Sequence, residues 1–146
     1  MSIMIKTIAS SQCLEIRSLV LRNGLETAKC KIPGDDLESS FHLGAFFNDK
    51  LVGISCFVLE NDPELGPTKM YRLRGMASLP EAKGKGAGRA LLNEAVVRAS
   101  KLEASHIWCN ARELAFGFYE KLNFEYYSEM FDIEGIGPHK KMFRKI

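Results

Sequence analysis

Short apolar runs bounded by turn residues recur along the chain and predict β-strands. They cover residues 3–8, 41–47, 51–59, 69–77, 106–110, 124–133 and 139–145. Asn48-Asp49-Lys50 separates two of these runs and predicts a β-hairpin. Gly135-Ile136-Gly137-Pro138 predicts the turn between the last two strands.

A helical spacing of apolar positions predicts three helices. The first spans 10–21, with Ser10 or Ser11 as N-cap. Its expected buried residues are Leu14, Ile16, Leu19 and Val20. The second spans 88–102 and carries one apolar stripe, Leu91, Leu92, Ala95, Val96, Ala99 and Leu102. The third spans 112–122 and ends at Asn123, a residue suited to the left-handed conformation.

The order of these elements predicts a mixed α/β (α+β) fold with a largely antiparallel central sheet of six to seven strands. Strand, helix and strand from Lys69 to Asn110 form its one expected parallel crossover. Residues 23–40 carry turn and loop signals, and a loop of this length usually covers or shapes a binding site. No repeat or linker interrupts residues 1–146, so we expect one domain.

The composition is that of a globular protein, with 46% hydrophobic and 26% charged residues. A net charge of +2 argues against a nucleic-acid partner. The amino terminus lacks the features of a signal peptide, and no apolar run is long enough to span a membrane. We therefore expect a cytoplasmic protein. The four cysteines, Cys13, Cys30, Cys56 and Cys109, lack the clustered spacing of a zinc site, so we expect reduced thiols and no metal.

A glycine-rich segment, Lys83-Gly84-Lys85-Gly86-Ala87-Gly88-Arg89, precedes the second helix. It lacks the lysine followed by serine or threonine of a P-loop, and its spacing differs from the dinucleotide fingerprint GxGxxG. It matches a third phosphate-binding pattern, [QR]xxGx[GA] between a strand and a helix, except that Lys83 occupies the first position.

Glycines allow backbone N–H groups to approach an anion closely, and the positive end of the following helix attracts the same anion. Lys83, Lys85 and Arg89 add positive charge around it. The alternative interpretation is a flexible basic loop before a helix. The segment therefore predicts an anion cradle whose ligand depends on its neighbours in the sequence.

Those neighbours resemble the motifs of one family. Arg74-Gly75-Met76-Ala77-Ser78-Leu79-Pro80-Glu81, the glycine-rich segment and Ala90-Leu91-Leu92 resemble the coenzyme A-binding motif of the GNAT N-acetyltransferase superfamily. Trp108-Cys109-Asn110-Ala111-Arg112 and Gly117-Phe118-Tyr119-Glu120-Lys121-Leu122-Asn123-Phe124 are similar to the next motif. The resemblance is strong over about residues 69–124, and Gly135-Ile136-Gly137-Pro138-His139 is similar to a small bacterial branch of uncharacterised members.

The resemblance implies a sheet with helices on both faces that splays between its fourth and fifth strands, near Met76 and Ala77. It implies acetyl-CoA as co-substrate, with the pantetheine arm bound to the backbone of Met76 and Ala77 and to Asn110. The pyrophosphate would bind to the loop residues Lys83, Gly84, Lys85, Gly86, Ala87, Gly88 and Arg89. Lys83 replaces the usual glutamine or arginine, which retains a cation but loses the planar bidentate geometry.

The implied reaction is direct attack of a primary amine on the thioester in a ternary complex. The N–H of Met76 or Ala77 would stabilise the oxyanion, and Tyr119 would protonate the leaving thiolate as general acid. The stretch that carries a glutamate base in many relatives holds Arg72 and Arg74 here. Glu60, Asp35, Asp36, His42 or water therefore remain as the base.

Several alternatives stay open. Arg22, Arg72 and Arg74 either bind an anionic acceptor or are solvated surface residues. Cys109 is interpreted as a small buried residue rather than an acyl-carrying nucleophile. The chain could also be a catalytically silent acyl-CoA-binding module or an interaction domain without coenzyme. The acceptor, a small molecule or a peptide, is not fixed by the sequence, and neither is the homodimer that is common in the family.

Overall fold

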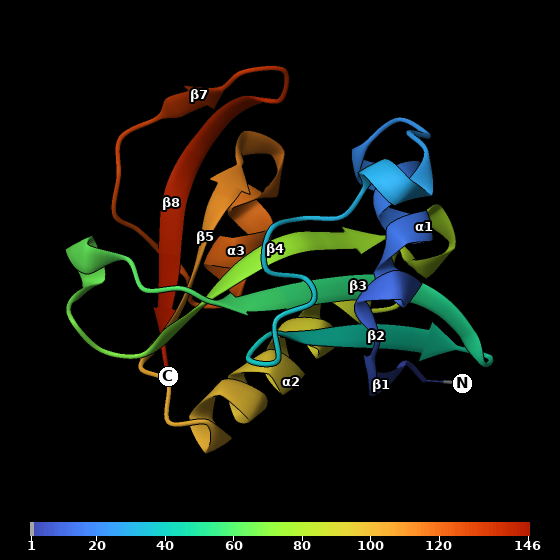
Figure 1. Cartoon of the computed structure of the whole chain (residues 1–146), viewed down its shortest axis with the longest axis horizontal. Coiled ribbons are helices and arrows are strands. Elements are labelled where there is room, and N and C mark those ends of the chain that lie inside the picture. Colours follow the sequence, from blue (N-terminus) through green and yellow to red (C-terminus); the bar gives the residue numbers. More distant parts are fainter. Residues whose placement is uncertain (1) are drawn as a thin grey trace.

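The computed structural model describes residues 2–146 and contains one twisted sheet (Figure 1). Its strands are β1 (Met4–Ile8), β2 (Phe41–Phe47), β3 (Lys50–Leu59), β4 (Met70–Ser78), β5 (His106–Arg112), β6 (Glu125–Tyr126), β7 (Phe131–Ile133) and β8 (Gly137–Lys145). The strand order is β1-β2-β3-β4-β5-β8-β6, and β7 also pairs with β8. The α-helices are α1 (Leu14–Ile16), α2 (Ala87–Lys101) and α3 (Phe116–Lys121).

The predicted fold class is confirmed. Only β4 and β5 pair in parallel, and the other pairings in the described chain are antiparallel. The sheet has eight strands rather than six to seven. The difference arises because the run 124–133 does not form one strand but two short ones, β6 and β7, which pair with separate parts of β8.

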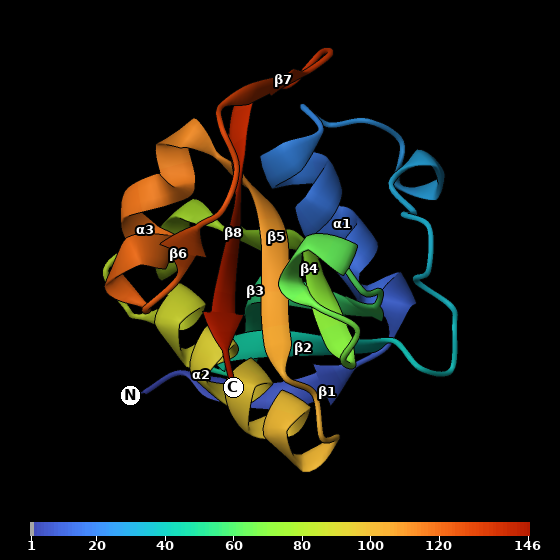
Figure 2. The ribbon, with the colours of Figure 1, turned by 90° about the vertical axis from the view of Figure 1, so that its left-hand side faces the viewer.

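Helices cover both faces of the sheet (Figure 2). On one face, α2 packs Leu91, Leu92, Ala95 and Ala99 onto the sheet in a core that also includes Tyr119 of α3. On the other face, Cys13 and Ile16 pack against Ile54 and Cys56 of β3. The stripe predicted for α2 is buried except that Val96 is only partly buried and Leu102, just past the helix, is exposed.

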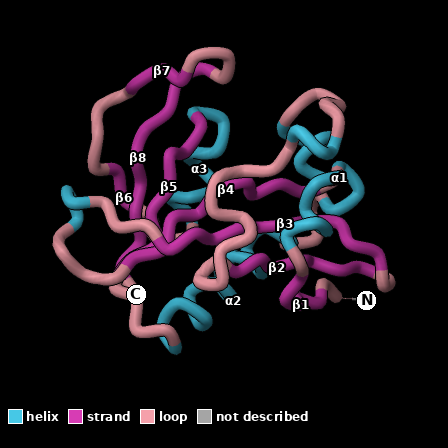
Figure 3. Tube along the Cα trace, viewed as in Figure 1, coloured by secondary structure: helices cyan, strands magenta, loops and turns pink. Residues whose placement is uncertain are grey.

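Figure 3 shows the turns and loops that join the helices and strands, and two of these turns have the conformation that the sequence predicts. Asn48 and Asp49 have φ angles of +50° and +63°, so the β2–β3 hairpin closes with the two left-handed residues of a type I′ turn. Asn123 has a φ of +67° and ends the α3 segment as predicted. The helix predicted over 112–122 is shorter, because β5 continues to Arg112 and a 3₁₀ turn, Glu113–Ala115, precedes α3.

The predicted helix over 10–21 is helical throughout but irregular. It consists of a 3₁₀ turn (Ser10–Cys13), α1 and a π-helical turn (Arg17–Leu21). The N-cap is Ala9, whose N–H donates to Gln12 Oε1 at 2.8 Å, so the predicted serine cap was wrong. Leu19 and Val20, expected inside, are exposed, because the change of helical pitch directs Arg17 and Ser18 inward instead.

Arg17 forms a buried ion pair with Asp35 of the 23–40 loop. Arg17 Nη1 and Nη2 donate to the two Asp35 carboxylate oxygens at 2.6 and 2.7 Å, and Nη1 also donates to the Cys30 carbonyl at 3.0 Å. Burial alone would raise the pKa of Asp35, but the hydrogen bonds from Arg17 and from the Ile32 N–H, together with the nearby positive charge, outweigh it and hold the pKa below its usual range. The pair therefore fastens the loop to the helical segment.

The sheet opens between β4 and β5, as expected. The two strands pair only from Met70 with His106 to Arg72 with Trp108, yet β4 continues to Ser78 and β5 to Arg112. Figure 1 shows the two strands diverging beyond this point. Among residues 2–146, no helix has the length and apolar character needed to cross a bilayer.

Replacement of Asp35 by asparagine tests the ion pair. We expect Asp35→Asn to lower the free energy of unfolding by about 3–5 kcal/mol, because Arg17 would remain buried without its counter-charge. Urea unfolding at pH 7 measures the change. Asp36→Asn, in the exposed neighbour whose side chain is 63% accessible, is the matched control and should change stability little. Equal stability of the two variants would show that the pair does not hold the loop.

Candidate functional site

The glycine-rich segment forms a tight turn that leads into α2. Gly84 and Gly86 have φ angles of +78° and +75°, and Gly86 is the N-cap of the helix. A Cβ at either position would meet no atom within 4 Å, so it is the backbone conformation that requires glycine here.

The amides at the start of α2 lack acceptors. Within residues 2–146, no hydrogen bond is formed by the N–H of Gly84, Gly86, Ala87, Gly88 or Arg89, and no side chain caps the helix. Free amides at a helix N-terminus, together with the helix dipole, attract anions. The start of α2 therefore presents a cluster of unpaired donors, which is what an anion cradle requires.

Gly88 has a different role from the two preceding glycines. A Cβ on Gly88 would lie 2.9 Å from two ring carbons of Phe118, a distance that real Cβ atoms do not tolerate. The missing side chain thus allows the first turn of α2 to approach α3. Gly88 and Phe118 both line a pocket beside this turn.

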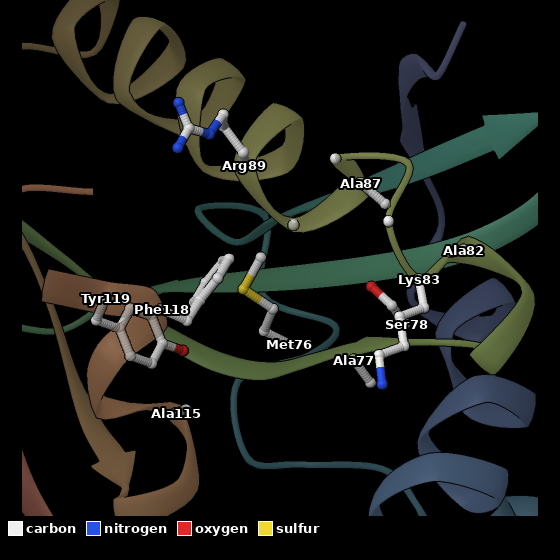
Figure 4. Close-up of a pocket in the computed structure, with 13 residues that line it drawn as sticks. Met76, Ala77, Ser78, Ala82, Lys83, Ala87, Arg89, Ala115, Phe118 and Tyr119 are labelled. Atoms are coloured by element: carbon white, nitrogen blue, oxygen red, sulfur yellow. The ribbon is translucent and has the colours of Figure 1, made fainter. Parts of the chain in front are cut away.

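A pocket of about 390 Å³, here called the loop pocket, lies beside the glycine turn. Figure 4 shows Phe118 and Tyr119 on one side, Ala77, Ser78 and Lys83 on the other, and Met76 between them. The predicted residues that line it are Met76, Ala77, Lys83, Gly84, Gly86, Ala87, Gly88, Arg89 and Tyr119. Lys85 is not among them, because its ammonium lies 5.0 Å from the ring centroid of Phe47.

The strand that borders the pocket is locally unpaired. The register between β3 and β4 passes from Cys56–Arg74 to Ile54–Ala77, so Gly75 and Met76 together oppose Ser55. Gly75 has a φ of +72°, as expected for a bulge with a left-handed glycine. Because pairing with β5 has already ended, Gly75 and Met76 have no register partner on either side.

A second pocket of about 280 Å³, the arginine pocket, lies where β4 and β5 separate. Its lining includes four arginines, Arg22, Arg72, Arg74 and Arg112, and the predicted Asn110. Ile32 of the 23–40 loop also lines it, as the length of that loop led us to expect. The Asn110 Oδ1 is buried without a partner among the described residues, so it requires a donor from elsewhere.

Tyr119 lies where the two pockets meet, and Met76 and Ala115 also line both. The ring is buried against Phe118 and Phe124, with centroids 5.2 and 5.1 Å away. Burial, with a smaller contribution from Cys109, raises the pKa of Tyr119 well above its usual value. The phenol therefore keeps its proton at neutral pH and can act as a proton donor.

Cys109 also lines the arginine pocket, but it is a poor nucleophile. Burial raises the pKa of its thiol to about 12, so the thiolate is rare at neutral pH. His106 lies three residues earlier on β5, does not line the arginine pocket, and has its Nδ1 2.7 Å from Ser105 Oγ. These features agree with the structural interpretation of Cys109.

None of the four side chains predicted as bases lines either pocket. Asp35 is held by Arg17, Glu60 contacts Arg72 at 3.2 Å, and Asp36 accepts from Ser10 Oγ at 2.6 Å. His42 Nε2 lies 2.9 Å from the Asp35 carbonyl, away from the pockets.

His139 does line the arginine pocket, although no sequence pattern marked it as a base. It pairs with Arg112 across β5 and β8, and its Nδ1 lies 2.7 Å from the Gly137 carbonyl. Since a carbonyl oxygen only accepts, Nδ1 carries the proton and Nε2 of the neutral ring has a free lone pair. The only sequence signal was its place in the glycine-rich turn Gly135-Ile136-Gly137-Pro138-His139.

A second grouping that sequence spacing missed lies outside both pockets. Cys13, His42 and Cys56 are buried with their ligand atoms within 4.8 Å of one another, and the two sulfurs are 3.5 Å apart. Arg17 Nη2 contacts Cys56 Sγ at 3.0 Å, so a positive charge already faces this sulfur. The hydrogen bond from Cys13, assisted by His42 and Arg17, lowers the pKa of Cys56.

The residues present fit coenzyme A. The free amides at Gly86, Ala87 and Gly88, with Lys83 and Arg89 beside them, suit a pyrophosphate. The unpaired stretch of β4 suits the amide groups of pantetheine, which would add to it as a strand does. The buried Asn110 Oδ1, which has no partner among the described residues, could accept a hydrogen bond from coenzyme A or from a second ligand where the two pockets meet.

Known proteins are similar to this chain in sequence or in fold. The model of the acetyltransferase (GNAT) family matches residues 13–124. The uncharacterized N-acetyltransferase YitI of Bacillus subtilis (strain 168) is 37% identical over 142 residues, which is 97% of this chain and 95% of that protein. Escherichia coli ElaA superposes with a TM-score of 0.75 at 18% identity, over 97% of this chain and 99% of that one. An aminoglycoside 6′-N-acetyltransferase complexed with coenzyme A superposes with a TM-score of 0.79 at 13% identity, over 97% and 96% of the two chains. By the extent of the family match and of the 37% identical relative, the chain belongs to the acetyltransferase (GNAT) family.

Proposed function

We propose that this chain is an N-acetyltransferase that transfers the acetyl group of acetyl-CoA to a primary amine within a ternary complex. One observation carries the proposal: an anion-binding pocket and an arginine-lined pocket meet at a buried tyrosine. The first pocket suits the donor and the second suits the acceptor. Both substrates would then meet at Tyr119, which lines both pockets.

Donor binding rests on two parts of the chain. The amides of Gly86, Ala87 and Gly88, with Lys83 and Arg89, would hold the pyrophosphate. The unpaired backbone at Met76 would hold the pantetheine arm and direct it toward Tyr119. Bound acetyl-CoA supplies an acetyl thioester, an acyl group that is already activated for transfer.

The backbone and Tyr119 would handle the charge that develops on transfer. The N–H of Met76 or Ala77 is our candidate donor to the carbonyl oxygen as it becomes negative. Tyr119, whose pKa is raised by burial, would donate its proton to the departing sulfur. A buried phenol suits this role, because it is fully protonated at neutral pH yet lies at the junction of the pockets.

We propose His139 as the general base. Its Nε2 is free to accept, since Nδ1 donates to Gly137. It lines the acceptor side, which none of the predicted carboxylates does. His139 would therefore take a proton from the ammonium form of the acceptor, so that the nitrogen attacks as a neutral amine.

Steady-state release of thiol from acetyl-CoA in the presence of a panel of amines tests the proposal as a whole. Amine-dependent release is expected. Coenzyme binding without such release would instead support the catalytically silent module, whose one supporting observation is that no carboxylate lines either pocket.

The glycine turn can be tested with a matched pair of variants. Gly86→Ala and Gly135→Ala each place alanine in an open left-handed position, with φ of +75° and +78°, so each should lose about 1–2 kcal/mol of stability. Only Gly86→Ala should weaken acetyl-CoA binding, by about tenfold or more, because it disturbs the free amides. Thermal midpoints with increasing acetyl-CoA measure the affinity. Equal affinities in the two variants would contradict the cradle.

Tyr119→Phe tests the general acid. We expect kcat to fall by about 100-fold or more, with little change in the affinity for acetyl-CoA, because the proton donor is lost but the ring remains. Tyr71→Phe, in another buried tyrosine that lines neither pocket, is the control. Near-normal turnover of Tyr119→Phe would remove the residue from the mechanism.

His139→Gln tests the general base. We expect kcat/KM to fall by about 100-fold near pH 7. The deficit should shrink as the pH rises, because a larger fraction of the amine is then already neutral and needs no base. His106→Gln, outside both pockets, is the control. A deficit that stays constant across pH would indicate a structural role for His139.

A further inference from the structure

The arginine pocket has an unusual balance of charge. Four arginines line it, and no aspartate or glutamate does. The lining that would face the acceptor is thus formally positive, although the net charge of the whole protein is only +2. A pocket of this kind concentrates anions and repels cations.

Several basic side chains near this part of the sheet have carboxylate partners, and one of them, Arg72, belongs to the pocket lining. Arg17 pairs with Asp35 at 2.6 Å, Arg72 with Glu60 at 3.2 Å and Lys141 with Asp62 at 3.0 Å. In residues 2–146, no ion pair or hydrogen bond to a carboxylate is formed by the side chain of Arg22, Arg74 or Arg112. Three guanidinium groups without a carboxylate partner therefore line the proposed acceptor side of the site.

Of these three arginines, Arg74 gives the strongest indication that the pocket binds an anion. Arg22 and Arg112 are exposed at the rim, whereas Arg74 is partly buried on β4. Burial first, and then the positive charge of Arg72, lowers the pKa of its guanidinium. A solvated surface arginine would not experience this penalty. The position costs stability in the free protein, and a bound anion would relieve the cost.

Coenzyme A does not account for these arginines. Its proposed phosphate site is the glycine turn, and none of Arg22, Arg74 and Arg112 lines the loop pocket. The residues shared by the two pockets are Met76, Ala115 and Tyr119. The arginines therefore lie on the far side of the junction from the donor phosphates.

We infer that the acceptor is an amine that carries its own anionic group, a carboxylate or a phosphate, bound by Arg74 with Arg22 and Arg112 at the rim. Guanidinium groups bind both anions through paired N–H donors, which also fixes the orientation of the ligand. Polycationic amines are poor acceptors for the same reason. The inference rests on the proposed acetyl transfer and specifies its substrate class.

Matched pairs of amines test this inference through thiol release from acetyl-CoA. One arm compares an α-amino acid series with the corresponding carboxamides, and the other compares glucosamine 6-phosphate with glucosamine. Spermidine serves as the cationic probe. At least one anionic amine should exceed its uncharged counterpart in kcat/KM by about tenfold or more, and the arm in which this occurs identifies carboxylate or phosphate as the anion.

Variants then assign the effect to the pocket. Arg74→Gln should lower kcat/KM for the preferred anionic amine by about 10- to 100-fold, mainly through KM, and Arg74→Lys should restore part of it. The KM for acetyl-CoA should not change. The thermal midpoint of Arg74→Gln should not fall, because the substitution removes an unpaired, partly buried charge. Arg98→Gln, in an arginine of α2 that contacts Thr7 outside both pockets, is the matched control.

The possible outcomes distinguish a failure of the inferred acceptor class from a failure of the proposed acetyl transfer. Turnover of uncharged or cationic amines in preference to anionic ones, or an Arg74→Gln variant with unchanged selectivity, overturns this inference and leaves acetyl transfer standing. Absence of thiol release with every amine in the panel overturns the proposed function, and this inference with it.

Discussion

Backbone pairing between β4 and β5 ends after Arg72 and Trp108, and the site depends on this early end. Parallel strands that stayed paired to Ser78 and Arg112 would close the sheet and separate its two faces. Beyond Arg72 the edge of β4 that would face β5 has no partner, and the bulge at Gly75 and Met76 interrupts pairing with β3 as well. The same opening therefore leaves an unpaired backbone edge beside the two pockets that meet at Tyr119.

The opening is supported from beneath by a buried ion pair. Arg17 Nε lies 3.2 Å from the position that a Cβ on Gly75 would take, so the bulge and the guanidinium are packed closely together. Arg17 also holds Asp35 and the Cys30 carbonyl, which fixes the loop that contributes Ile32 to the acceptor side. Arg17, which packs against the bulge, is neutralised by Asp35, whereas Arg22, Arg74 and Arg112 have no carboxylate partner among the described residues. Arg17 therefore supports the fold, and the other three are available to a ligand.

Sequence patterns predicted the parts of this fold that depend on local interactions. The hairpin at Asn48 and Asp49 and the helix from Ala87 have strong turn and periodicity signals, and the glycine turn has a recognisable spacing. The prediction that Leu19 and Val20 are buried was wrong, because Arg17 turns inward instead. Its buried partner, Asp35, lies 18 residues away in a loop. Non-local contacts of this kind leave little trace in the spacing of apolar residues.

The candidate functional side chains show the same limit. Tyr119 became a candidate through a motif on one helix, whereas His139 becomes one only because β8 pairs beside β5. Cys13 and Cys56, 43 positions apart, meet for a similar reason. A spacing rule written for neighbouring residues does not detect either arrangement.

The two pockets draw on different stretches of the chain. The loop pocket is built by 76–89 and 115–119, whereas the arginine pocket alone also uses 21–32, 72–75, 109–112 and 133–139. The first and last of these additional stretches come from opposite ends of the sequence and lie on the two sides of the opened sheet edge (Figure 2). Recombination or insertion at either end could thus remodel acceptor choice while the central donor module is inherited intact. A chain built in this way can diversify what it modifies without having to reinvent how it modifies it.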